Sequence, residues 1–425
     1  MGSWNRVVML KISADDQKML DGCEGDAVAM AMRIVSEMGR VQGAAELVNV
    51  NSAHIDSCLY HGLSGVEFAE RLVAREGRVS IPSSLNVGAL DLLHPEKVRL
   101  KGPERDYAKR LMNAYVALGC IPTWTCAPYQ AGYRPACGEN IAWAESNAVV
   151  FANSVLGART NRYGDFMDIC CALTGRAPLT GLHLTENRFA TIEIDTTGIS
   201  EKLKQSDVFY AVLGSWLGRN IGSEIAVFSG LPETVTEDQL KALGASAASS
   251  GGVALFHVAG VTPEACTTQA ALNGQTPSLV VHLAAEQLAA ERDRLSTARS
   301  ELLDVIAVGS PHFSLPEFQK LLKLLDGRKC KIPLIACTGR HVLTALERMN
   351  YMEALSQAGV DLLVDTCVVV TPVFPKSDGV MMTNSGKFAH YSLSLTGHDV
   401  VFGSLEDCVN SAIAGSVVRD ESSWV

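Results

Sequence analysis

Two cysteines stand in segments that could present a thiol to a metal ion. Cys126 lies in "PTWTCAPY", residues 122–129, where two prolines limit the freedom of the backbone, and Cys367 lies in "DTC". Each follows a predicted strand and sits at a turn, where its side chain can point into a cleft. Neither belongs to a CxxC spacing, so a buried, unreactive thiol is the alternative interpretation for both.

Other polar residues could bind or transform a small anionic substrate. The turn "GSPH" offers Ser310 and His312 at the end of a predicted strand. Lys387, in the Gly-containing segment "TNSGKFAHY", could hold a carboxylate or act as a base if it is desolvated, although a solvated lysine is the default. Arg159 is suited to bidentate carboxylate binding, and an internal salt bridge to Glu139 or Glu145 is the alternative.

The segment "AHIDSCLYHGLSG" is unusually rich in reactive groups. It carries His54, Asp56 and His61, so Cys126 with either histidine could form a thiol nucleophile and its base. The glycines of "GLSG", residues 62–65, could present backbone amides to an anion at the start of a helix.

Composition favours a large α/β enzyme. The chain has 425 residues, of which 47% are hydrophobic and 19% charged, and two or three domains are expected at this length. A net charge of −10 without a basic cluster argues against nucleic acid as a partner. The sequence shows neither a signal peptide nor an apolar run long enough to span a membrane, so we expect a cytoplasmic protein whose twelve cysteines are reduced.

The last third of the chain is typical of a parallel sheet. Apolar strands at 304–308, 331–336 and 360–365 alternate with helical segments at 315–327 and 340–359, which predicts right-handed β-α-β-α-β connections. Ligands bind at the carboxyl ends of such strands. These ends carry Ser310, Cys337 and Cys367, listed here in chain order.

Further elements are expected before this sheet. Residues 120–126 and 206–218 resemble strands, 142–160 a helix crowded with small and polar residues, and the Ala/Ser/Gly segment 242–252 a loop or linker. We divide the chain into an N-terminal α/β domain (1–200), a middle α/β segment (201–300) and a C-terminal α/β domain (301–425).

Several longer motifs together resemble the large subunit or large domain of the aconitase X family. They are "AHIDSCLYHGLSGVEFAERL", "IPSSLNV", "GCIPTWTCAPY", "GENIAWAESNAVVFANSVLGARTNRYGDF", "GSPHFSLPEF", "DTC" and "TNSGKFAHY", which span nearly the whole chain. The resemblance implies an aconitase-like α/β fold of several domains, with parallel sheets and helices on both faces, and an iron-sulfur cluster. Members are dehydratases of cis-3-hydroxy-L-proline in bacteria or of mevalonate 5-phosphate in archaea.

The resemblance also implies a set of metal ligands. The cluster cysteines of the family fall on Cys126 and Cys367, and the third ligand of the archaeal type belongs to a "GCPH" turn that reads "GSPH" here, with Ser310 in place of the cysteine. A hydroxyl binds soft metals more weakly than a thiolate does. This departure matches the bacterial hydroxyproline type, which is associated with a 2Fe-2S cluster. Cys337 is a further candidate for the third sulfur.

The substrate site is carried over in the same way. The resemblance places substrate or cluster contacts at Gly62, Leu63, Ser64, Asn86, Glu145, Ser146 and Lys387, and Arg159 is added as a substrate contact because a guanidinium suits a carboxylate. Among these, Lys387, Glu145 and Ser64 are candidates for the base that removes the poorly acidic Cα proton, and a serine contributed by the small domain of the family is a further candidate. The iron would act as a Lewis acid on the departing hydroxide.

Dehydration of cis-3-hydroxy-L-proline to Δ1-pyrroline-2-carboxylate is therefore the predicted reaction. Dehydration of mevalonate 5-phosphate is the alternative within the family, and a non-catalytic iron-sulfur sensor is the alternative of another class. The family closes its site with a small swivelling domain, which we expect as a separate small subunit.

Overall fold

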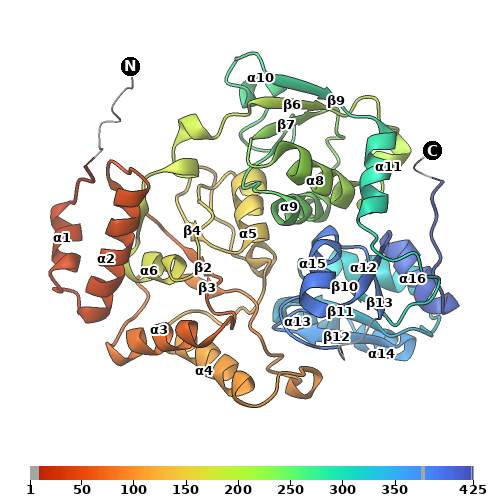
Figure 1. Cartoon of the computed structure of the whole chain (residues 1–425), viewed down its shortest axis with the longest axis horizontal. Coiled ribbons are helices and arrows are strands. Elements are labelled where there is room, and N and C mark those ends of the chain that lie inside the picture. The colour runs from red at the N-terminus through yellow and green to blue at the C-terminus, as the bar shows by residue number, and fades with distance from the viewer. Residues whose placement is uncertain (1–8, 375–378, 423, 425) are drawn as a thin grey trace.

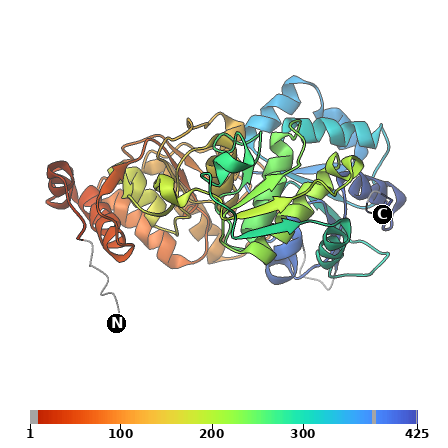
Figure 2. The same ribbon diagram turned by 90° about the horizontal axis from the view of Figure 1, so that it is seen from above.

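Four β-sheets organise the chain in the computed structural model, which describes residues 9–374, 379–422 and 424. Residues 9–190 lie at one end of the molecule, and the middle and last parts lie one above the other at the opposite end (Figure 1). Seen from above, the molecule is elongated along the axis that joins these ends (Figure 2). Among the described residues, no helix is long and apolar enough to cross a membrane.

The first part of the chain holds a three-stranded parallel sheet of order β3-β2-β4 and a small antiparallel pair, β1-β5. Its helices cover these sheets and enclose a hydrophobic core built around the buried helix α6. The bounds are α1 Ala14–Leu20, α2 Asp26–Val41, β1 Leu47–Asn49, β2 Ala53–Ile55, α3 Leu63–Ala74, β3 Ser83–Leu85, α4 Pro103–Ala117, β4 Ala142–Trp143, α5 Ser146–Phe151, α6 Met167–Thr174 and β5 Arg176–Pro178.

The middle part is a four-stranded parallel sheet of order β8-β7-β6-β9 with two long helices packed beside it. The bounds are β6 Ile192–Asp195, α7 Glu201–Lys204, α8 Asp207–Ile221, β7 Ala226–Ser229, α9 Glu237–Ser250, β8 His257–Val258, α10 Thr268–Ala271, β9 Leu279–His282 and α11 Ala285–Arg294.

The last part is a five-stranded parallel sheet of order β12-β11-β10-β13-β14. Its bounds are β10 Val305–Val308, α12 Leu315–Leu325, β11 Leu334–Thr338, α13 Arg340–Arg348, α14 Met352–Ala358, β12 Val360–Val364, β13 Val380–Thr383, α15 Gly386–Thr396, β14 Asp399–Phe402 and α16 Leu405–Ala414.

Helices bury both faces of this last sheet. Along β10, Ile306 and Val308 join the core that includes α12 and α16, whereas Val305 and Ala307 join the core that includes α8, α9 and α15. Successive strand residues point to opposite faces, so a strand covered on both sides consists of consecutive apolar residues. The prediction of an α/β fold with parallel sheets and helices on both faces is confirmed, as is the β-α-β-α-β order from residue 304 to 365.

Two predictions for the middle part are wrong. Residues 206–218 form most of helix α8 instead of a strand, and residues 242–252 belong largely to helix α9 instead of a linker. Helix α8 is buried continuously from Val208 to Gly218, so it lacks the polar face that identifies a helix from sequence. Small residues allow the two helices to pack closely. A Cβ added to Gly214 of α8 would come within 2.1 Å of the carbonyl oxygen of Leu243 of α9.

The segments around Cys126 and Glu145 also differ from prediction. Residues 120–126 form no named strand and make one isolated bridge, from Ile121 to Ser84, before the backbone enters a left-handed conformation at Trp124 (φ 45°). The predicted helix 142–160 is a short strand, β4, followed by helix α5, whose last turns widen into a π-helix over Ala152–Leu156.

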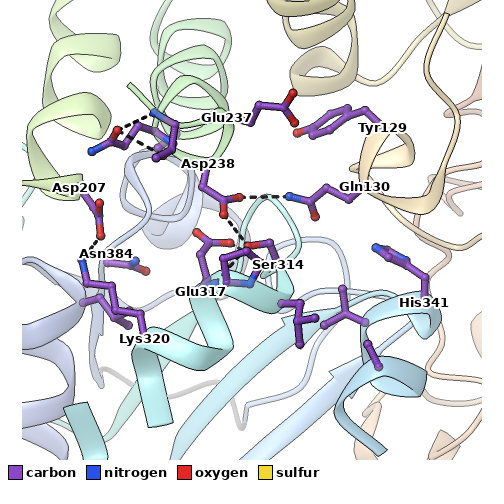
Figure 3. A pocket seen from close by; sticks show the side chains of 18 of the residues that line it. Tyr129, Gln130, Asp207, Glu237, Asp238, Ser314, Glu317, Lys320, His341 and Asn384 are labelled. Atoms are coloured by element: carbon purple, nitrogen blue, oxygen red, sulfur yellow. Dashed lines mark hydrogen bonds and ion pairs between the residues drawn. The ribbon is translucent and has the colours of Figure 1, made fainter. Parts of the chain in front are cut away.

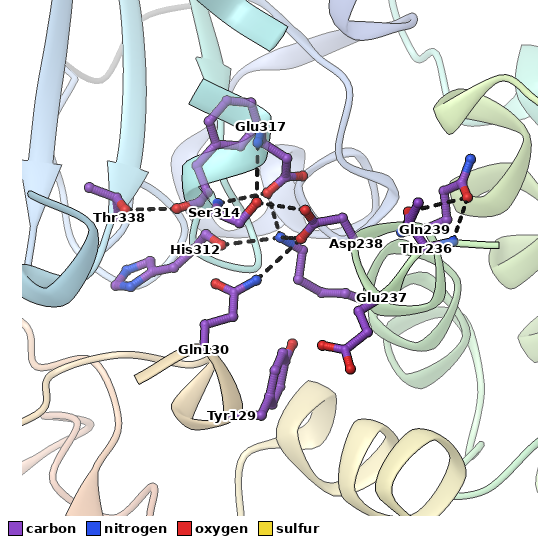
Figure 4. A network of polar contacts seen from close by, with 12 residues as sticks. Tyr129, Gln130, Thr236, Glu237, Asp238, Gln239, His312, Ser314, Glu317 and Thr338 are labelled. Atoms are coloured by element: carbon purple, nitrogen blue, oxygen red, sulfur yellow. Dashed lines mark hydrogen bonds and ion pairs between the residues drawn. The ribbon is translucent and has the colours of Figure 1, made fainter. Parts of the chain in front are cut away.

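A network of polar contacts connects the three parts (Figure 4). The ammonium of Lys241, on α9, lies 2.8 Å from the Asp238 carboxylate and 2.5 Å from that of Glu317, on α12, and it also donates to the carbonyl oxygen of His312. Gln130, from the first part, donates to Asp238. Only 2% of the Lys241 side chain is exposed, so the neighbouring carboxylates compensate a charge that water does not reach.

We predict that Lys241→Met destabilises the protein by about 3 kcal/mol, because removing one partner of a buried pair leaves carboxylates uncompensated. The measurement is equilibrium unfolding in urea. Lys323→Met, at an exposed position of α12, is the matched control, and we expect it to change the free energy of unfolding by less than about 0.5 kcal/mol. Equal losses in the two variants would contradict the role of the network.

Candidate active site

Three polar side chains follow the three neighbouring strands of the first parallel sheet. Asp56 comes directly after β2, Asn86 directly after β3, and Glu145 two residues after β4. The register pairs Ile55 with Leu85 and His54 with Trp143, which places Asn86 and Glu145 on either side of Asp56. The Asn86 amide donates a hydrogen bond to the Asp56 carboxylate. The carboxyl edge of this sheet therefore carries a row of three polar groups.

The carboxyl edge of the last sheet carries the second set of candidates. Ser310 follows β10, Cys337 lies near the end of β11, and Cys367 follows β12, as the sequence predicts. The loop before Cys367 is held by Asp365, whose carboxylate accepts two hydrogen bonds from Arg340 at 2.7 and 2.6 Å. Its carbonyl oxygen accepts from the N–H of Gly88, two residues after Asn86. The two sheet edges therefore meet.

His312 connects the loops that carry the two cysteines. Its backbone N–H donates to the Cys126 sulfur at 3.2 Å, its Nδ1 lies 3.1 Å from the Thr125 hydroxyl, and its Nε2 lies 3.1 Å from the Thr366 carbonyl oxygen. A carbonyl oxygen only accepts, so Nε2 carries the proton and Nδ1 accepts from Thr125. Burial lowers the pKa of His312 to about 3, which keeps this neutral tautomer at physiological pH.

Helix α5 holds the Cys126 loop from the other side. The amide of Asn147 donates to the Cys126 carbonyl oxygen at 3.0 Å and to the Tyr129 hydroxyl at 3.1 Å. The Tyr129 ring stacks on Phe151, one turn further along α5. Both prolines, the buried Trp124 and these contacts fix the direction of the thiol.

Both thiols lie in a buried, charged environment. Cys126 and Cys367 are each 5% exposed. Cys367 raises the pKa of Cys126, and both raise the pKa of Cys337 nearby. Burial raises the pKa of Cys126 to about 12 and raises that of Cys367, while the ammonium of Lys387 acts in the opposite direction on both. Without a metal ion, both sulfurs are neutral thiols.

The cation beside the thiols forms an ion pair with Glu145. The Lys387 ammonium lies 2.6 Å from Oε1 of Glu145, and Oε2 of the same carboxylate accepts from the N–H of Ala148, so Glu145 also caps α5. Burial would raise the pKa of Glu145, but Lys387 and the backbone N–H groups hold it below its ordinary value. Burial would likewise lower the pKa of Lys387, and Glu145 together with Cys126 raises it. Both groups are therefore charged.

Asp56 differs from Glu145 in its electrostatic environment. Its loop is anchored by Asp168, whose carboxylate accepts from the backbone N–H groups of Asp56 and Ser57 at 2.8 and 2.9 Å. Burial, followed by the negative charge of Glu145, raises the pKa of Asp56 to about 7. The two neighbouring carboxyl groups therefore have widely separated pKa values.

Three buried polar atoms around this region have no hydrogen-bond partner. They are Nε2 of His54, Oδ1 of Asn86 and Oγ1 of Thr366. Buried polar groups are normally paired with protein, water or a ligand. Asn86 lies level with Asp56 on the neighbouring strand, and His54 is two residues before Asp56 in the chain. Thr366 directly precedes Cys367. The site can therefore accept a polar ligand between the two sheet edges.

The candidate ligand residues suit a metal cofactor that takes two thiolates from the chain. Cys126 and Cys367 are soft ligands, and Ser310, on the neighbouring strand, offers a hydroxyl. Within residues 9–374, 379–422 and 424, no three His, Cys, Asp or Glu side chains are arranged as a metal site. A third ligand would therefore have to be the serine, a rearranged Cys337, or a group from outside the chain.

The structure brings together most, but not all, of the residues that the resemblance suggests. Cys126, Cys367, Lys387, Glu145 and Asn86 lie in one region, and the Ser146 hydroxyl donates to Glu145 at 3.3 Å. Gly62, Leu63 and Ser64 begin helix α3, with Leu63 and Ser64 exposed.

Arg159 is directed elsewhere. Its guanidinium donates to the carbonyl oxygen of His183 at 3.1 Å, so the ion pair with Glu145 considered from the sequence is wrong. Lys387 also differs from expectation, because it lies in the first turn of α15 instead of a loop and is paired instead of solvated.

The thiol–histidine pair considered from the sequence is not formed. His54 lies 2.8 Å from the Ser84 hydroxyl, and burial lowers its pKa to about 4, while His61 is exposed. The histidine that contacts Cys126 is His312, through its backbone N–H. Sequence reasoning did not assign roles to His312, Asn147 or Asp56, although "SPH" and "HID" at strand ends were visible signals.

A cavity of about 750 Å³ lies beside this region, between α9, α12 and the loop that follows Cys126 (Figure 3). Its lining includes Tyr129, Gln130, Asp238, Glu317 and His341, and does not include either cysteine of the site, Glu145 or Lys387. Ion pairs such as Arg134–Glu237 link its walls. The cavity therefore lies along the carboxyl edge of the last sheet, where Asn384 directly follows β13, but the thiols and the paired charges are not part of its lining.

Three sequence models of one family match the chain in succession. The Aconitase X first domain matches residues 9–186, the second domain residues 190–293 and the third domain residues 303–414. Together they cover most of the chain.

Individual relatives agree with this assignment. A cis-3-hydroxy-L-proline dehydratase of Pseudomonas aeruginosa is 40% identical over 98% of this chain and 72% of its own length. The enzyme of that name from Hypocrea jecorina is 39% identical over 96% of this chain and 69% of its own length. The phosphomevalonate dehydratase large subunit of Methanocaldococcus jannaschii is 34% identical over 93% of this chain and 98% of its own length. The crystal structure of Thermococcus kodakaraensis aconitase X in its holo-form superposes with a TM-score of 0.84 at 31% identity, covering 95% of this chain and all of that one.

We predict that Lys387→Met destabilises the protein in a pH-dependent way. In the wild type the lowered pKa of Glu145 contributes stability that is present above the ordinary glutamate pKa of about 4.3 and is lost as the pH falls through the folded-state pKa. Without Lys387, burial raises that pKa, so ionised Glu145 becomes a cost above about pH 4.3. The loss should be about 3 kcal/mol at pH 7.5 and smaller at pH 4, as measured by urea unfolding.

Lys320→Met is the control for this variant. Lys320 pairs with Asp207, but 48% and 42% of the two side chains are exposed, so we expect a loss below about 1 kcal/mol at either pH. A loss in Lys387→Met that does not change with pH would show that Glu145 is not held ionised by Lys387.

Proposed function

The chain belongs to the aconitase X family and is a hydro-lyase, and we propose that it removes water from cis-3-hydroxy-L-proline. The similarity to cis-3-hydroxy-L-proline dehydratases, at 39–40% identity over nearly the whole chain, is the observation that carries this substrate. Ser310 supports it, because a serine at this turn matches the bacterial hydroxyproline type of the family.

The reaction breaks one C–H bond and one C–O bond. A base takes the proton from Cα, the electrons of that bond form the C2–C3 double bond, and the C3–O bond breaks as hydroxide departs. The resulting enamine takes up a proton at C3 and releases one from the ring nitrogen, which gives Δ1-pyrroline-2-carboxylate. The Cα proton is weakly acidic, so the site must stabilise negative charge on the substrate carboxylate as the proton leaves.

We propose an iron-sulfur cluster as the cofactor, with 2Fe-2S favoured. Cys126 and Cys367 would supply thiolates and Ser310 the third ligand from the chain, with Cys337 as the alternative. When bound, the cluster would supply a Lewis acid that assists departure of the hydroxide. Binding also requires that both thiols lose their protons, which the ammonium of Lys387 favours.

The ion pair at the site has a role in substrate binding under this proposal. Lys387 would hold the substrate carboxylate, and Glu145, with Ser146, would accept a hydrogen bond from the ring nitrogen. Asn86 offers an unpartnered Oδ1 to the same ligand. We keep Gly62, Leu63 and Ser64 as proposed substrate contacts, and Lys387, Glu145 and Ser64 as proposed catalytic groups, on the resemblance to the family alone. Arg159 stays a proposed substrate contact because its guanidinium suits a carboxylate.

Mevalonate 5-phosphate is the alternative substrate, since phosphomevalonate dehydratase large subunits are also relatives of the chain. A phosphate would add negative charge to a region that already holds Asp56 and Glu145, and whose neighbouring ammonium, that of Lys387, is paired with Glu145. The charge balance therefore favours the zwitterionic amino acid.

We also propose a small swivelling domain as partner. The archaeal relatives are named large subunits, and the Pseudomonas aeruginosa relative is longer than the part that this chain matches. The two sheet edges that carry the site would be closed by such a domain. The cytoplasm is the proposed location, in agreement with twelve cysteines that are all free.

The substrate is tested by incubating the protein, anaerobically purified and supplied with its small partner where one is required, with each candidate. We expect Δ1-pyrroline-2-carboxylate from cis-3-hydroxy-L-proline and no anhydromevalonate phosphate from mevalonate 5-phosphate. Turnover of the phosphate ester alone would replace the proposed substrate with the alternative.

The cluster ligands are tested through the visible absorption of the anaerobic protein. We expect Cys126→Ala and Cys367→Ala each to lose the chromophore, because soft thiolate ligands are removed. Cys408→Ala, at a buried thiol in the core of the last sheet, is the matched control and should retain it. Retention of the chromophore in both site variants would show that the ligand assignment is wrong.

A further inference from the structure

Asp56 lies between two residues that we propose as substrate contacts. It follows β2, the middle strand of the first parallel sheet, with Asn86 beside it after β3 and Glu145 beside it after β4. Neighbouring strands lie about 4.8 Å apart, so side chains at one register level are within reach of one small ligand. The resemblance to the family carries over contacts at Asn86 and Glu145 and none at Asp56.

One oxygen of the Asp56 carboxylate is available to a ligand. The Asn86 amide donates to Oδ1, and within residues 9–374, 379–422 and 424 no protein donor contacts Oδ2. The residue is partly exposed. Close to it, Oδ1 of Asn86 and Nε2 of His54 are buried without a hydrogen-bond partner. This edge therefore offers a carboxylate oxygen together with further polar atoms.

The neighbouring carboxyl groups already have partners. Glu145 lies 2.6 Å from the ammonium of Lys387 and accepts from the N–H of Ala148 through its other oxygen. Asp168 is fully buried and accepts from the backbone N–H groups of Asp56 and Ser57 and from the Ser57 hydroxyl. Asp56 is therefore the carboxyl group at this edge that lacks a cation or several donors in direct contact.

The electrostatic environment of Asp56 favours a cationic ligand. Burial and the negative charge of Glu145 raise the pKa of Asp56 to about 7, and Lys387 opposes this rise with a smaller effect than that of Glu145. A positive charge next to the carboxylate would favour its ionised form. Hydrogen bonds between a charged N–H and a carboxylate are also about twice as strong as neutral ones. The position therefore suits a cationic nitrogen.

The proposed substrate carries such a nitrogen. The ring nitrogen of cis-3-hydroxy-L-proline is a secondary amine, so at neutral pH it is an ammonium with two N–H groups. When Glu145 accepts one of these, the second requires another acceptor. The charge of Glu145 is balanced by Lys387, so the positive charge of the substrate also requires another anion. Asp56, on the adjacent strand, can meet both requirements.

We propose that Asp56 is the counter-ion of the ring ammonium of the substrate and a determinant of substrate specificity, an inference that rests on the proposed dehydration of cis-3-hydroxy-L-proline. Oδ2 of Asp56 accepts one N–H of the ammonium and Glu145 accepts the other, while Lys387 holds the substrate carboxylate. Asp56 binds and orients the substrate in this role and takes no proton from Cα. The retained ammonium keeps a positive charge next to Cα, which stabilises the negative charge that develops there in the reaction.

The same carboxylate disfavours the alternative substrate. Mevalonate 5-phosphate has no nitrogen and carries both a carboxylate and a phosphate. Either anion would be repelled by ionised Asp56, and neither can accept a proton-donating contact from it. Specificity often combines an attractive contact to one ligand with a repulsive contact to its competitor, and Asp56 supplies both.

A purely structural role for Asp56 predicts a different pattern. If its carboxylate only supported the sheet edge through Asn86, its loss would weaken every ligand of the site to a similar degree. Loss of a counter-ion instead weakens the cationic ligand and strengthens the anionic one. The direction of the change for each ligand therefore separates the two roles.

The test uses the holoenzyme, with its small partner where one is required, and the variants Asp56→Asn, Asp56→Ala and Asp106→Asn. Asparagine at position 56 removes the charge and keeps an acceptor for the Asn86 amide, and Asp106 is an exposed aspartate on α4 that serves as the control. Initial rates of pyrroline formation give kcat and KM. Calorimetric titration gives the Kd of L-proline, of (S)-tetrahydrofuran-2-carboxylate, in which oxygen replaces the ring nitrogen, and of mevalonate 5-phosphate.

We expect the Kd of L-proline to rise by about 30-fold in Asp56→Asn, because a charge-assisted hydrogen bond is lost. KM for cis-3-hydroxy-L-proline should rise by a similar factor, which separates this binding role from an effect on kcat alone. The Kd of the tetrahydrofuran analogue should change by less than about 3-fold, and mevalonate 5-phosphate should bind about 5-fold more tightly because a like charge is removed. Asp106→Asn should match the wild type.

Two results would overturn the inference. One is a Kd of L-proline in Asp56→Asn that stays within about 3-fold of the wild type, and the other is an equal weakening of all three ligands. If Asp56→Asn does not fold, the same titrations of Asp56→Ala decide by the same criteria. Absence of pyrroline from the wild type would contradict the proposed function itself, and this result is distinct because the titrations do not depend on turnover.

Discussion

The geometry of the site depends on the hydrogen bonds of His312, whose side chain is neutral. Its ring forms hydrogen bonds with the Thr125 hydroxyl and the carbonyl oxygen of Thr366, and the backbone N–H of the same residue donates to the sulfur of Cys126. His312 therefore connects the loops that carry both candidate cluster thiols. The arrangement requires a proton on Nε2 and none on Nδ1, and burial enforces this because a charged imidazole would be poorly solvated there. The loops of two cysteines that are 241 residues apart in the chain are thereby held together.

Charge balance around the thiols follows a similar principle. Lys387 is buried with Glu145, and each keeps the other ionised against the cost of desolvation. The pair leaves Asp56 as the neighbouring carboxyl group without a cation in direct contact, which is why its pKa moves toward neutrality while that of Glu145 moves away. The same local field therefore moves the pKa values of two neighbouring carboxyl groups in opposite directions.

Small side chains allow the separate parts of the chain to approach closely enough for these contacts. Helix α9 packs against α5, α8 and α15, and α15 carries Lys387 in its first turn. A Cβ added to Gly386 would come within 2.2 Å of the Ser246 hydroxyl, so glycine at the start of α15 permits the approach to α9. The Ala/Ser/Gly composition of α9 therefore allows the neighbouring helices to pack closely against it, and it does not mark a linker.

The sequence by itself determined the α/β class, the parallel order of the last sheet and the positions of Ser310, Cys337 and Cys367 at its carboxyl edge, because apolar strands alternating with amphipathic helices have distinct local periodicities. Its motifs also identified the family. Periodicity could not identify α8 or α9, since a helix buried on all sides has no polar face. Only the tertiary structure showed that His312 bridges the cysteine loops, that Lys387 is paired with Glu145 and that Asp56 lies beside them. Burial and charge at these residues come from segments far apart in the chain, and no local pattern records which distant groups will become neighbours.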